Sequence, residues 1–566
     1  MEFMKVALLF EELEKTASGN DLRDLLSAFL KDLSEEEISV VVYLCLGRLG
    51  PEYDDIVLGF AEKTVLKALS RASGVSEKKV DSLMVTLGDA GLVAEQVLAR
   101  KLTTLVPVES LTIHDLYAGL IKISHVSGSR SVEAKSDILV SLLGRCSGVE
   151  CKYVVRIALG TIRLGIAEMT VVDSLAIAFI GSKKDKVDVE RAYMVCPDLG
   201  YIASVLQSQG VGGLSKITAT VGRPVKMMLA QRVTDLDQIE EKMPGSVLVE
   251  AKYDGERVQV HKLDSGVVRL FSRQLQDITL QFPDLVAAVS THLKCSSCIV
   301  EGEILALGEN GRPLAFQTLM QRRRKNDIAD YVSKIPVVLK LFDVLLVDSV
   351  VVMGHQLVER KKWLNAIVLP GGAMELATNM VMDDVYEIDT YFRSMLDAGY
   401  EGVIVKSLDG SYQAGHRGWN WIKWKKDYAG ELVDTFDVVV IGAFHGKGKR
   451  KGGYGALLCA VYDSGSEKFL SFCKLGTGLT DTVLEGLNTV LDGNRVKEKP
   501  KNVESGVIAD VWFSPIVVCE ISGAEITRSP SHASGFALRF PRFLKFREKK
   551  ATDATTLVEV KEMGVK

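Results

Sequence analysis

The sequence predicts a multidomain protein with an all-α N-terminal block, a central α/β domain and a C-terminal β-barrel. Its 566 residues are too many for one hydrophobic core and predict about three or four domains. Apolar residues recur at three- and four-residue spacings as far as about residue 215, and from there they alternate as in strands. After about residue 427 the strands are short and separated by glycine-rich turns, as in an OB barrel. We therefore expect domains at 1–215, 216–426 and 427–566.

The N-terminal block is dominated by helical periodicity. Residues 3–17, a segment from Val80 and residues 132–143 carry apolar side chains on one helical face. Ser34 is followed by three glutamates, which is typical of an N-cap with an acidic first turn. These patterns predict a bundle of amphipathic helices.

The central block alternates between strands and helices. Residues 247–260, 267–272, 299–307, 337–346 and 402–406 have the alternation or the apolar content of strands, and residues 388–398 have that of an amphipathic helix. Because the strands follow one another without regular crossover helices, we expect antiparallel or mixed sheets. In the C-terminal block, residues 436–444, 455–462 and 469–475 are the expected barrel strands.

Composition excludes several classes of protein. Apolar residues make up 47% of the chain and charged residues 25%, as in soluble globular proteins. No apolar run reaches the roughly 20 residues of a membrane span, and the N-terminus lacks the layout of a signal peptide. The nine cysteines are scattered, and the pair Cys295 and Cys298 cannot by itself complete a zinc site. We expect reduced cysteines and a cytoplasmic protein.

The net charge of −4 does not indicate a polyanionic partner, so any basic surface must be local. One local candidate is the segment 445–453, in which four cations lie among glycines and one histidine. The segment is compatible with phosphate contact and equally with a solvated hairpin tip.

The most informative motif is Lys252-Tyr-Asp-Gly255, between two β-rich apolar stretches. Lysine is a poor nucleophile while it is protonated, so a catalytic lysine needs cationic neighbours or burial that favour the free amine. Gly255 allows the backbone to approach a phosphate closely, and Asp254 is placed to orient a nucleotide or the lysine. Alone, the tetrapeptide is also compatible with a surface turn.

Four further segments follow it in a fixed order. Val300-Glu-Gly-Glu-Ile304 sets two carboxylates beside a glycine in a strand pattern, and Glu401-Gly-Val-Ile-Val-Lys406 sets one glutamate and one lysine in another. Trp421-Ile-Lys-Trp-Lys425 alternates bulky residues with lysines, so both lysines face one side of a strand. Basic and apolar residues alternate in Leu538-Arg-Phe-Pro-Arg-Phe-Leu-Lys-Phe-Arg547.

This order of motifs resembles the covalent nucleotidyltransferases, in particular the ATP-dependent DNA ligases of the archaeal and eukaryotic replicative type. The resemblance covers nearly the whole chain. It includes Gly222-Arg-Pro-Val-Lys-Met-Met-Leu-Ala230, which is similar to the start of the family's catalytic domain, and Ser529-Pro-Ser-His-Ala-Ser-Gly535 before the last motif. It implies a helical DNA-binding domain, an α/β nucleotidyltransferase (adenylation) domain and an OB-fold.

The resemblance implies that the protein seals nicks between a 5′-phosphate and a 3′-hydroxyl in duplex DNA during replication, repair and recombination. Lys252 would attack the α-phosphate of ATP and hold AMP in a phosphoramidate bond. The AMP would pass to the 5′-phosphate, and the 3′-hydroxyl would then displace it. Each step is an in-line displacement at phosphorus, so catalysis rests on positioning and on neutralising charge.

The resemblance also assigns nucleotide contacts. It implies that Glu250 lies at the edge of the adenine and that Phe342 stacks on the base. It also implies that Arg257 and Arg273 contact the ribose and phosphates. Further predicted nucleotide-binding residues are Glu303, Arg417, Lys423 and Lys425. From spacing alone Arg257 would face away from Lys252 unless the glycine turn intervenes, and a lone phenylalanine in a strand is ordinarily a core residue.

The expected metal cofactor is Mg²⁺, with Mn²⁺ as an alternative, bound by Glu303 and Glu401. Mg²⁺ takes oxygen ligands and uses one or two protein carboxylates, with water or phosphate completing its shell. Glu301 has the same strand-face parity as Glu303 and is the weaker candidate for the site.

The expected partner is nicked duplex DNA, bound by a protein that acts as a monomer. The resemblance implies DNA contacts from Arg156 and Arg163 in the helical block and from Arg539 and Arg542 near the C-terminus. From the residues alone, the two helical arginines are ordinary surface charges and the block is equally an interaction scaffold. The family's sliding-clamp peptide would correspond to Leu98–Val106, which lacks its glutamine and paired aromatics, so nothing in the residues supports clamp binding.

One further departure and three rival functions bear on the assignment. The final family motif has an aspartate where this chain has Lys549, which bears on how the pyrophosphate is oriented. An NAD-dependent ligase would carry a four-cysteine zinc module, and an RNA ligase or a capping enzyme would lack the long helical block. A DNA-binding scaffold without activity would lose Lys252 or the metal glutamates, and all are present. Use of ADP, GTP or NAD besides ATP stays open.

Overall fold

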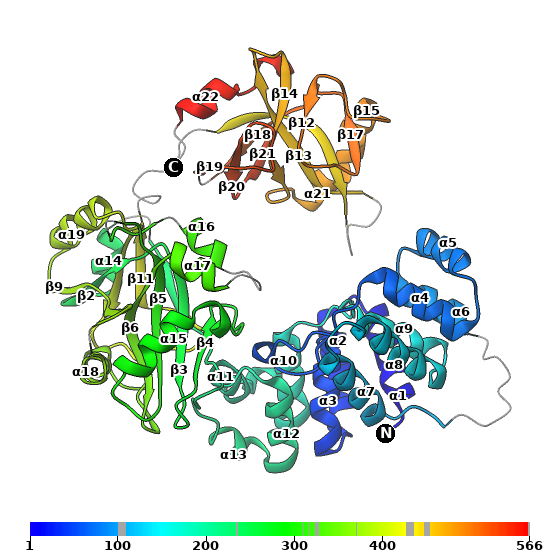
Figure 1. Ribbon diagram of the computed structural model, residues 1–566, viewed down its shortest axis with the longest axis horizontal. Coiled ribbons are helices and arrows are strands. Elements are labelled where there is room, and N and C mark those ends of the chain that lie inside the picture. The colour runs from blue at the N-terminus through cyan, green and yellow to red at the C-terminus, as the bar shows by residue number, and fades with distance from the viewer. Residues whose placement is uncertain are drawn as a thin grey trace. The chain divides into compact units, whose positions relative to one another are not determined.

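The structure is a computed structural model, and it describes residues 1–99, 109–233, 236–309, 311–314, 316–322, 328–369, 371–425, 435–446, 453–523 and 525–563. It divides into two compact units, Met1–Trp424 and Lys425–Lys566. Figure 1 shows the helical first part of the chain, the sheets of the middle part and the strand-rich C-terminal part. The segments expected at 98–106 and 445–453 lie largely outside the described residues.

Residues up to 214 fold into helices, as the periodicity predicts. They are α1 (Phe3–Lys15), α2 (Gly19–Lys31), α3 (Glu35–Cys45), α4 (Glu62–Ser73), α5 (Glu77–Leu87), α6 (Ala90–Leu98), α7 (Ile113–His125), α8 (Ser131–Arg145), α9 (Gly148–Ala158), α10 (Glu168–Ile180), α11 (Val187–Val195), α12 (Leu199–Gln209) and α13 (Val211–Leu214). Ser34 caps α3 together with Glu37 in a reciprocal capping box, which satisfies backbone N–H groups at the helix start. The apolar faces of these helices bury a shared core.

Two sheets form the rest of the first unit. The first has the order β1 (Leu229–Arg232), β11 (Arg417–Lys425), β10 (Gly402–Ser407), β2 (Val247–Lys252) and β9 (Asn379–Met382). The second has the order β4 (Val268–Ser272), β3 (Glu256–Lys262), β5 (Cys298–Ala306), β6 (Val337–Val347) and β7 (Val350–Val351), with β8 (Met374–Leu376) also paired to β6. The predicted mixed pairing is confirmed, because β1 and β11 run parallel whereas β2 and β10 run antiparallel.

Helices cover these sheets. They are α14 (Asp237–Lys242), α15 (Pro283–His292), α16 (Phe316–Leu319), α17 (Ile328–Lys334), α18 (Leu357–Ile367) and α19 (Val385–Asp397). Helix α18 packs on β6 of the second sheet, and α19 packs on β2 and β10 of the first (Figure 1). The expected strand 247–260 is two strands, because residues 253–255 turn the chain from the first sheet into the second.

The C-terminal unit is rich in strands, as expected. It contains β12 (Phe436–His445), β13 (Tyr454–Asp463), β14 (Lys468–Leu475), α21 (Asp481–Leu491), β15 (Arg495–Val496), β16 (Val503–Glu504), β17 (Val511–Phe513), β18 (Val518–Ser522), β19 (Glu525–Arg528), β20 (Phe536–Arg539), β21 (Arg542–Arg547) and α22 (Leu557–Glu562). Strand β12 pairs along its length with β13, β17 and β18, so the sheet curls around one core. Among the described residues, no helix is both long and apolar enough to span a bilayer.

Candidate active site

Lys252 is the last residue of β2, and the neighbouring strand β10 brings a carboxylate to it. The antiparallel register sets Lys252 opposite Gly402, and the backbone N–H of Glu401 donates to the Lys252 carbonyl over 2.9 Å. The Lys252 ammonium forms an ion pair with the Glu401 carboxylate. Both side chains are partly exposed, so the pair is accessible to a ligand.

Other cations surround this pair. Burial lowers the pKa of Lys423, and the positive charges of Arg417, Lys252, Arg273 and Arg232 lower it further. Lys423 lies opposite Arg232 in the parallel register of β1 and β11. The structure thus brings together four of the residues that the sequence assigned to nucleotide phosphates or to catalysis, and it adds Arg232. Such a concentration of positive charge suits a polyphosphate.

Glu303 on β5 is the second carboxylate near Lys252. Burial raises the pKa of Glu303 to about 7, although Lys252, Arg257 and the backbone N–H of Gly255 act in the opposite direction. Gly255 closes the turn onto β5 so tightly that a Cβ would lie 2.3 Å from the carbonyl oxygen of Ile304. No larger residue fits there, and the glycine of the motif therefore has a steric role.

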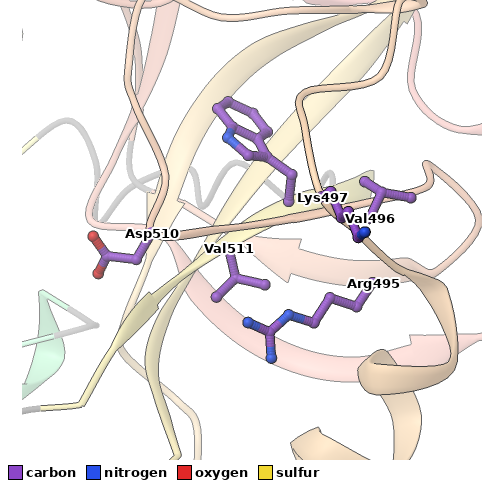
Figure 2. A pocket seen from close by; sticks show the side chains of 6 residues that line it. Arg495, Val496, Lys497, Asp510 and Val511 are labelled. Atoms are coloured by element: carbon purple, nitrogen blue, oxygen red, sulfur yellow. The ribbon is translucent and has the colours of Figure 1, made fainter.

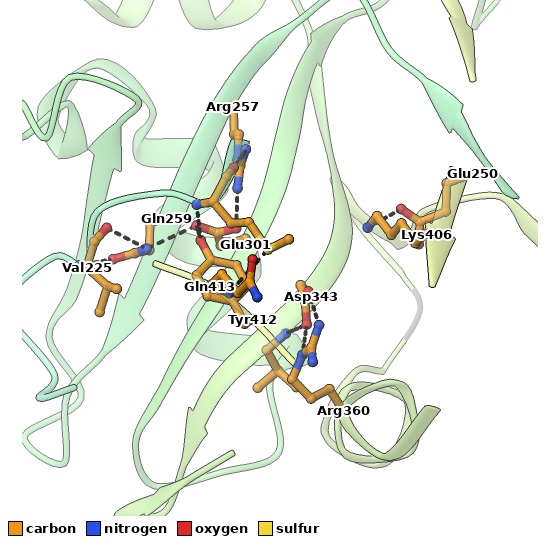
Figure 3. A network of polar contacts seen from close by, with 12 residues as sticks. Val225, Glu250, Arg257, Gln259, Glu301, Asp343, Arg360, Lys406, Tyr412 and Gln413 are labelled. Atoms are coloured by element: carbon orange, nitrogen blue, oxygen red, sulfur yellow. Dashed lines mark hydrogen bonds and ion pairs between the residues drawn. The ribbon is translucent and has the colours of Figure 1, made fainter. Parts of the chain in front are cut away.

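Glu301, two residues earlier, has a different environment. It is fully buried, and it accepts hydrogen bonds from Arg257 Nη2 (2.7 Å), Gln259 Nε2 (3.1 Å) and the Tyr412 hydroxyl (2.8 Å) (Figure 3). Burial by itself would lower the pKa of the Arg257 guanidinium. The negative charge of Glu301 has the larger effect, and the pKa of Arg257 is raised. Glu301 therefore anchors Arg257. The turn at 253–255 brings Arg257 back towards the site, so the strand-parity argument does not hold across it.

Lys406 contacts both Glu250 and Phe342, and Lys361 contacts Glu250 as well. The Glu250 carboxylate is buried and forms ion pairs with Lys361 and with Lys406, the latter at 2.5 Å. The Lys406 ammonium lies 4.7 Å from the ring centroid of Phe342 and 4.3 Å from that of Trp421. Phe342 is 9% exposed and contacts Trp421 edge to face. Figure 3 shows Glu250 and Lys406 beside the network around Glu301.

The carboxylates of Glu303 and Glu401 are the residues at this site that could hold a divalent cation. Lys252 is ion-paired with Glu401 and lowers the pKa of Glu303, so both carboxylates flank the same amine. Two carboxylates fit the oxygen preference of Mg²⁺, which takes the rest of its ligands from water or phosphate. In the part of the chain that the structure describes, no three His, Cys, Asp or Glu side chains are grouped as metal ligands. The described cysteines are free thiols, and Cys298 begins β5.

The two arginines assigned to DNA in the helical block differ sharply. Arg156 is 3% exposed and forms ion pairs with Glu14 and Asp89, so the expectation that it is a surface charge is wrong. Helix α9 also buries Lys152, and Lys152 and Arg156 both form ion pairs with Glu14. Arg163, in contrast, has a side chain that is 58% exposed, and its guanidinium forms an ion pair with the buried Asp89 at 2.8 Å.

The basic residues of the C-terminal unit lie on its outer strands. Arg539 ends β20 and Arg542 begins β21, and both are exposed. Lys549, which replaces the expected aspartate, pairs with Asp437 at 3.0 Å, and Arg547 reaches Glu520 at 3.3 Å. Lys425 ends β11, where the second unit begins.

A hollow of about 450 Å³ lies elsewhere on the C-terminal unit (Figure 2). It is lined by Arg495, Val496, Lys497, Asp510, Val511 and Trp512. None of these residues belongs to the motifs that the sequence singled out.

Sequence reasoning missed several residues of the site. Lys406 was visible as the last residue of the Glu401 motif, but nothing in the motif pointed to Glu250 as its partner. Lys361 lies on α18 in no motif, and Gln259 and Tyr412 are recognisable only by their contacts with Glu301.

Family comparisons match three consecutive parts of the chain. Residues 2–176 match "DNA ligase N terminus", residues 227–425 match "ATP dependent DNA ligase domain", and residues 450–550 match "ATP dependent DNA ligase C terminal region".

Individual proteins agree with these matches. The chain is 43% identical to DNA ligase 2 of Thermofilum pendens, over 100% of this chain and 97% of that protein. It is 38% identical to DNA ligase 1 of Methanosarcina acetivorans, over 100% and 99%. Among solved structures, the one described as "Pmar-Lig_Pre." covers 96% of this chain and 99% of its own with a TM-score of 0.54 and 18% identity, which is a likeness of fold.

Proposed function

The chain belongs to the ATP-dependent DNA ligases, and on that premise we propose that Lys252 is the residue that becomes bonded to AMP. The protein seals nicks in duplex DNA with ATP, through an adenylate intermediate. The observation that carries the assignment of Lys252 is its position between Glu401, Glu303 and the cations around Lys423.

In the first step the Lys252 amine attacks the α-phosphate of ATP, a P–N bond forms, and the bond to pyrophosphate breaks. The ammonium of Lys252, which lies among the cations near Lys423, must first lose a proton, because only the free amine is nucleophilic. The same cations neutralise charge on the phosphates as the bond forms. In the second step the 5′-phosphate of the nick attacks the AMP phosphorus and frees Lys252. In the third step the 3′-hydroxyl attacks that 5′-phosphate and AMP leaves.

We assign the nucleotide contacts as the resemblance implies. Glu250 and Phe342 hold the base, and Arg257, Arg273 and Arg417 hold the ribose and phosphates. Lys423 and Lys425 contact the α-phosphate from one face of β11. The ion pair with Glu301 supports the role of Arg257, because it fixes the guanidinium in one orientation.

We propose that Glu303 and Glu401 hold Mg²⁺, which Mn²⁺ can replace, and that Glu303 also contacts the nucleotide. When bound, the ion would neutralise charge on the phosphates and on the leaving group. The raised pKa of Glu303 supports this assignment, since a buried carboxylate that lacks full compensation gains from a cation.

For DNA, we propose contacts from Arg163, Arg539 and Arg542, which are exposed. Arg156 is withdrawn from this set because its guanidinium is buried in ion pairs. Lys549, which stands where the family motif has an aspartate, forms an ion pair with Asp437. We further propose that the protein acts as a monomer in the cytoplasm, and binding to a sliding clamp has no support in the residues described.

The assignment is tested by incubating the protein with α-labelled ATP and counting the label that stays on the denatured chain. Lys252→Ala and Lys252→Arg should both abolish labelling, because a guanidinium does not deprotonate near neutral pH. Lys362→Ala, an exposed lysine on α18, is the matched control and should label normally. Comparable labelling of Lys252→Ala would refute the assignment. Parallel reactions with labelled ADP, GTP and NAD measure how strictly ATP is required.

A further inference from the structure

A pair of thiols lies at the start of β5, and no step of the proposed reaction uses it. Cys298 is the first residue of β5 and is buried, whereas Cys295 lies in the preceding turn and is partly exposed. Their side chains are hydrogen-bonded to each other. All nine cysteines of the chain fall within the described residues, and the other seven are buried. Cys295 is therefore the thiol that a dissolved reagent meets first.

Asp348 holds the turn between the two cysteines. Its carboxylate oxygen Oδ1 accepts from the backbone N–H of Ser296 over 2.7 Å and from that of Ser297 over 3.1 Å. The backbone N–H of Asp348 donates to the Ser297 carbonyl over 2.8 Å. Three hydrogen bonds to one residue thus fix the chain between the thiols. Because the two sulfur atoms are held next to each other in advance, a bond between them forms with little loss of conformational freedom.

Lys262 on β3 adds positive charge beside the pair. It lies directly opposite Cys298 in the register of β3 and β5, and its ammonium donates to the Leu293 carbonyl over 2.8 Å. The hydrogen bond from Cys298 lowers the pKa of the Cys295 thiol. The charge of Lys262 lowers that pKa further, while burial and the charge of Asp348 act in the opposite direction. The same hydrogen bond, together with burial, raises the pKa of Cys298. Cys295 is therefore the better nucleophile, and Cys298 keeps its proton.

We propose that Cys295 and Cys298 form a thiol–disulfide exchange site whose substrates are small-molecule disulfides, such as oxidised glutathione. The Cys295 thiolate attacks one sulfur of the small disulfide, the S–S bond breaks, and one thiolate leaves as a mixed disulfide forms. Cys298 then loses its proton and attacks the Cys295 sulfur, which closes the bond between the two cysteines and expels the second thiolate. The protein pair loses two electrons, the small disulfide gains them, and the two released thiolates take up the two protons.

The pair suits exchange rather than metal binding. A structural zinc site takes four ligands, and within the described ranges no three His, Cys, Asp or Glu side chains are grouped to hold a metal. An exposed thiol beside a buried one suits exchange, because the first meets the disulfide and the second is presented with a sulfur only once the mixed disulfide has formed. In a reducing compartment the free pair is the resting form, and the bond forms transiently when small disulfides accumulate.

The experiment treats the full-length protein with oxidised glutathione, blocks the remaining thiols with iodoacetamide during unfolding, and maps every cysteine by peptide mass spectrometry. The native protein should contain a bond between Cys295 and Cys298 without bound glutathione, while the buried Cys146 stays reduced. Cys298→Ala should retain glutathione on Cys295, because no second thiol expels it. Cys295→Ser should leave Cys298 reduced, with modification about tenfold or more slower, because a buried thiol meets the reagent poorly.

The role of Lys262 is tested by rate. Lys262→Gln should slow the loss of the Cys295 thiol, because less of it is then present as thiolate, whereas Lys262→Arg keeps the charge and should restore the rate. Lys362→Gln removes an exposed lysine on α18 and should react as the native protein does. Equal slowing in Lys262→Gln and Lys262→Arg would indicate that the lysine acts through packing and not through charge.

None of these residues belongs to the nucleotide site, so every variant should still be labelled by ATP, which shows that it is folded. The proposal is overturned if the native protein keeps glutathione on Cys295 without closing the bond to Cys298. It is also overturned if both thiols stay reduced under conditions that oxidise a synthetic peptide containing the same Cys-Ser-Ser-Cys segment.

Discussion

Lys252 and Glu401 form an ion pair although 149 residues separate them in the chain. The pairing of β2 with β10 creates this contact, since the turn before Gly402 sets the carboxylate beside the end of β2. Two motifs that the sequence shows separately thereby become one site.

Glu303→Ala and Glu401→Ala should each lower nick sealing strongly and shift its Mg²⁺ dependence to higher concentration, because each removes one of the two carboxylates. Glu301→Ala should leave the Mg²⁺ midpoint unchanged and raise the ATP requirement, because it leaves Arg257 buried without its partner. Titrations of sealing with Mg²⁺ and with ATP distinguish the two effects. A Mg²⁺ shift that is largest in Glu301→Ala would reverse the assignment.

Glu303→Gln should be inactive yet more resistant to unfolding than the native protein at pH 8. The pKa of Glu303 is raised from 4.5 to about 7 in the folded chain, so folding favours its protonated form. Ionisation of Glu303 therefore costs stability as pH rises from 4.5 to about 7, and glutamine avoids that cost. Denaturant unfolding in EDTA, followed by tryptophan fluorescence, should give Glu303→Gln a higher midpoint than the native protein at pH 8. This difference in midpoint should disappear near pH 5. A difference in midpoint that grows towards pH 5 would contradict the predicted direction of the pH dependence.

Arg163→Gln should weaken binding to nicked DNA without affecting protein labelling by ATP. Loss of one phosphate contact should reduce the slope of log affinity against log salt by about 0.9. Arg163 has a φ of 58°, which is strained for a residue with a side chain. Arg163→Gly should therefore lose the same affinity with little or no loss of stability. An unchanged salt slope in both variants would leave the helical block as an interaction scaffold.

Asp343→Asn should destabilise the first unit by about 3–5 kcal/mol, because it leaves the fully buried guanidinium of Arg360 without its counter-charge. The double variant Asp343→Leu with Arg360→Met should be less destabilised, since no charge then remains buried. Denaturant midpoints measure both. Equal destabilisation in the two would indicate that packing, rather than charge, dominates at this position.

The sequence by itself determined the type and order of the structural blocks. Apolar residues repeat at helical spacing before residue 215 and alternate as in strands after it. Both patterns can be read from consecutive residues without knowledge of tertiary contacts. The motifs at Lys252, Glu303 and Glu401 were also visible, because each joins a chemically distinctive residue to a glycine in a strand pattern. The division at 1–215, 216–426 and 427–566 stays a prediction, and the helices and the two sheets form one compact unit here.

Only the tertiary structure decided which side chains meet. Arg156 has the spacing of a surface residue on its helix, yet Glu14 and Asp89 from two other segments enclose it. Lys361 and Lys406 become partners of Glu250 because strand register and the packing of α18 bring three distant segments together. Local periodicity predicts which face of an element a residue occupies. Its partner on that face depends on contacts between residues from 67 to more than a hundred positions apart, and no single stretch of sequence encodes such contacts.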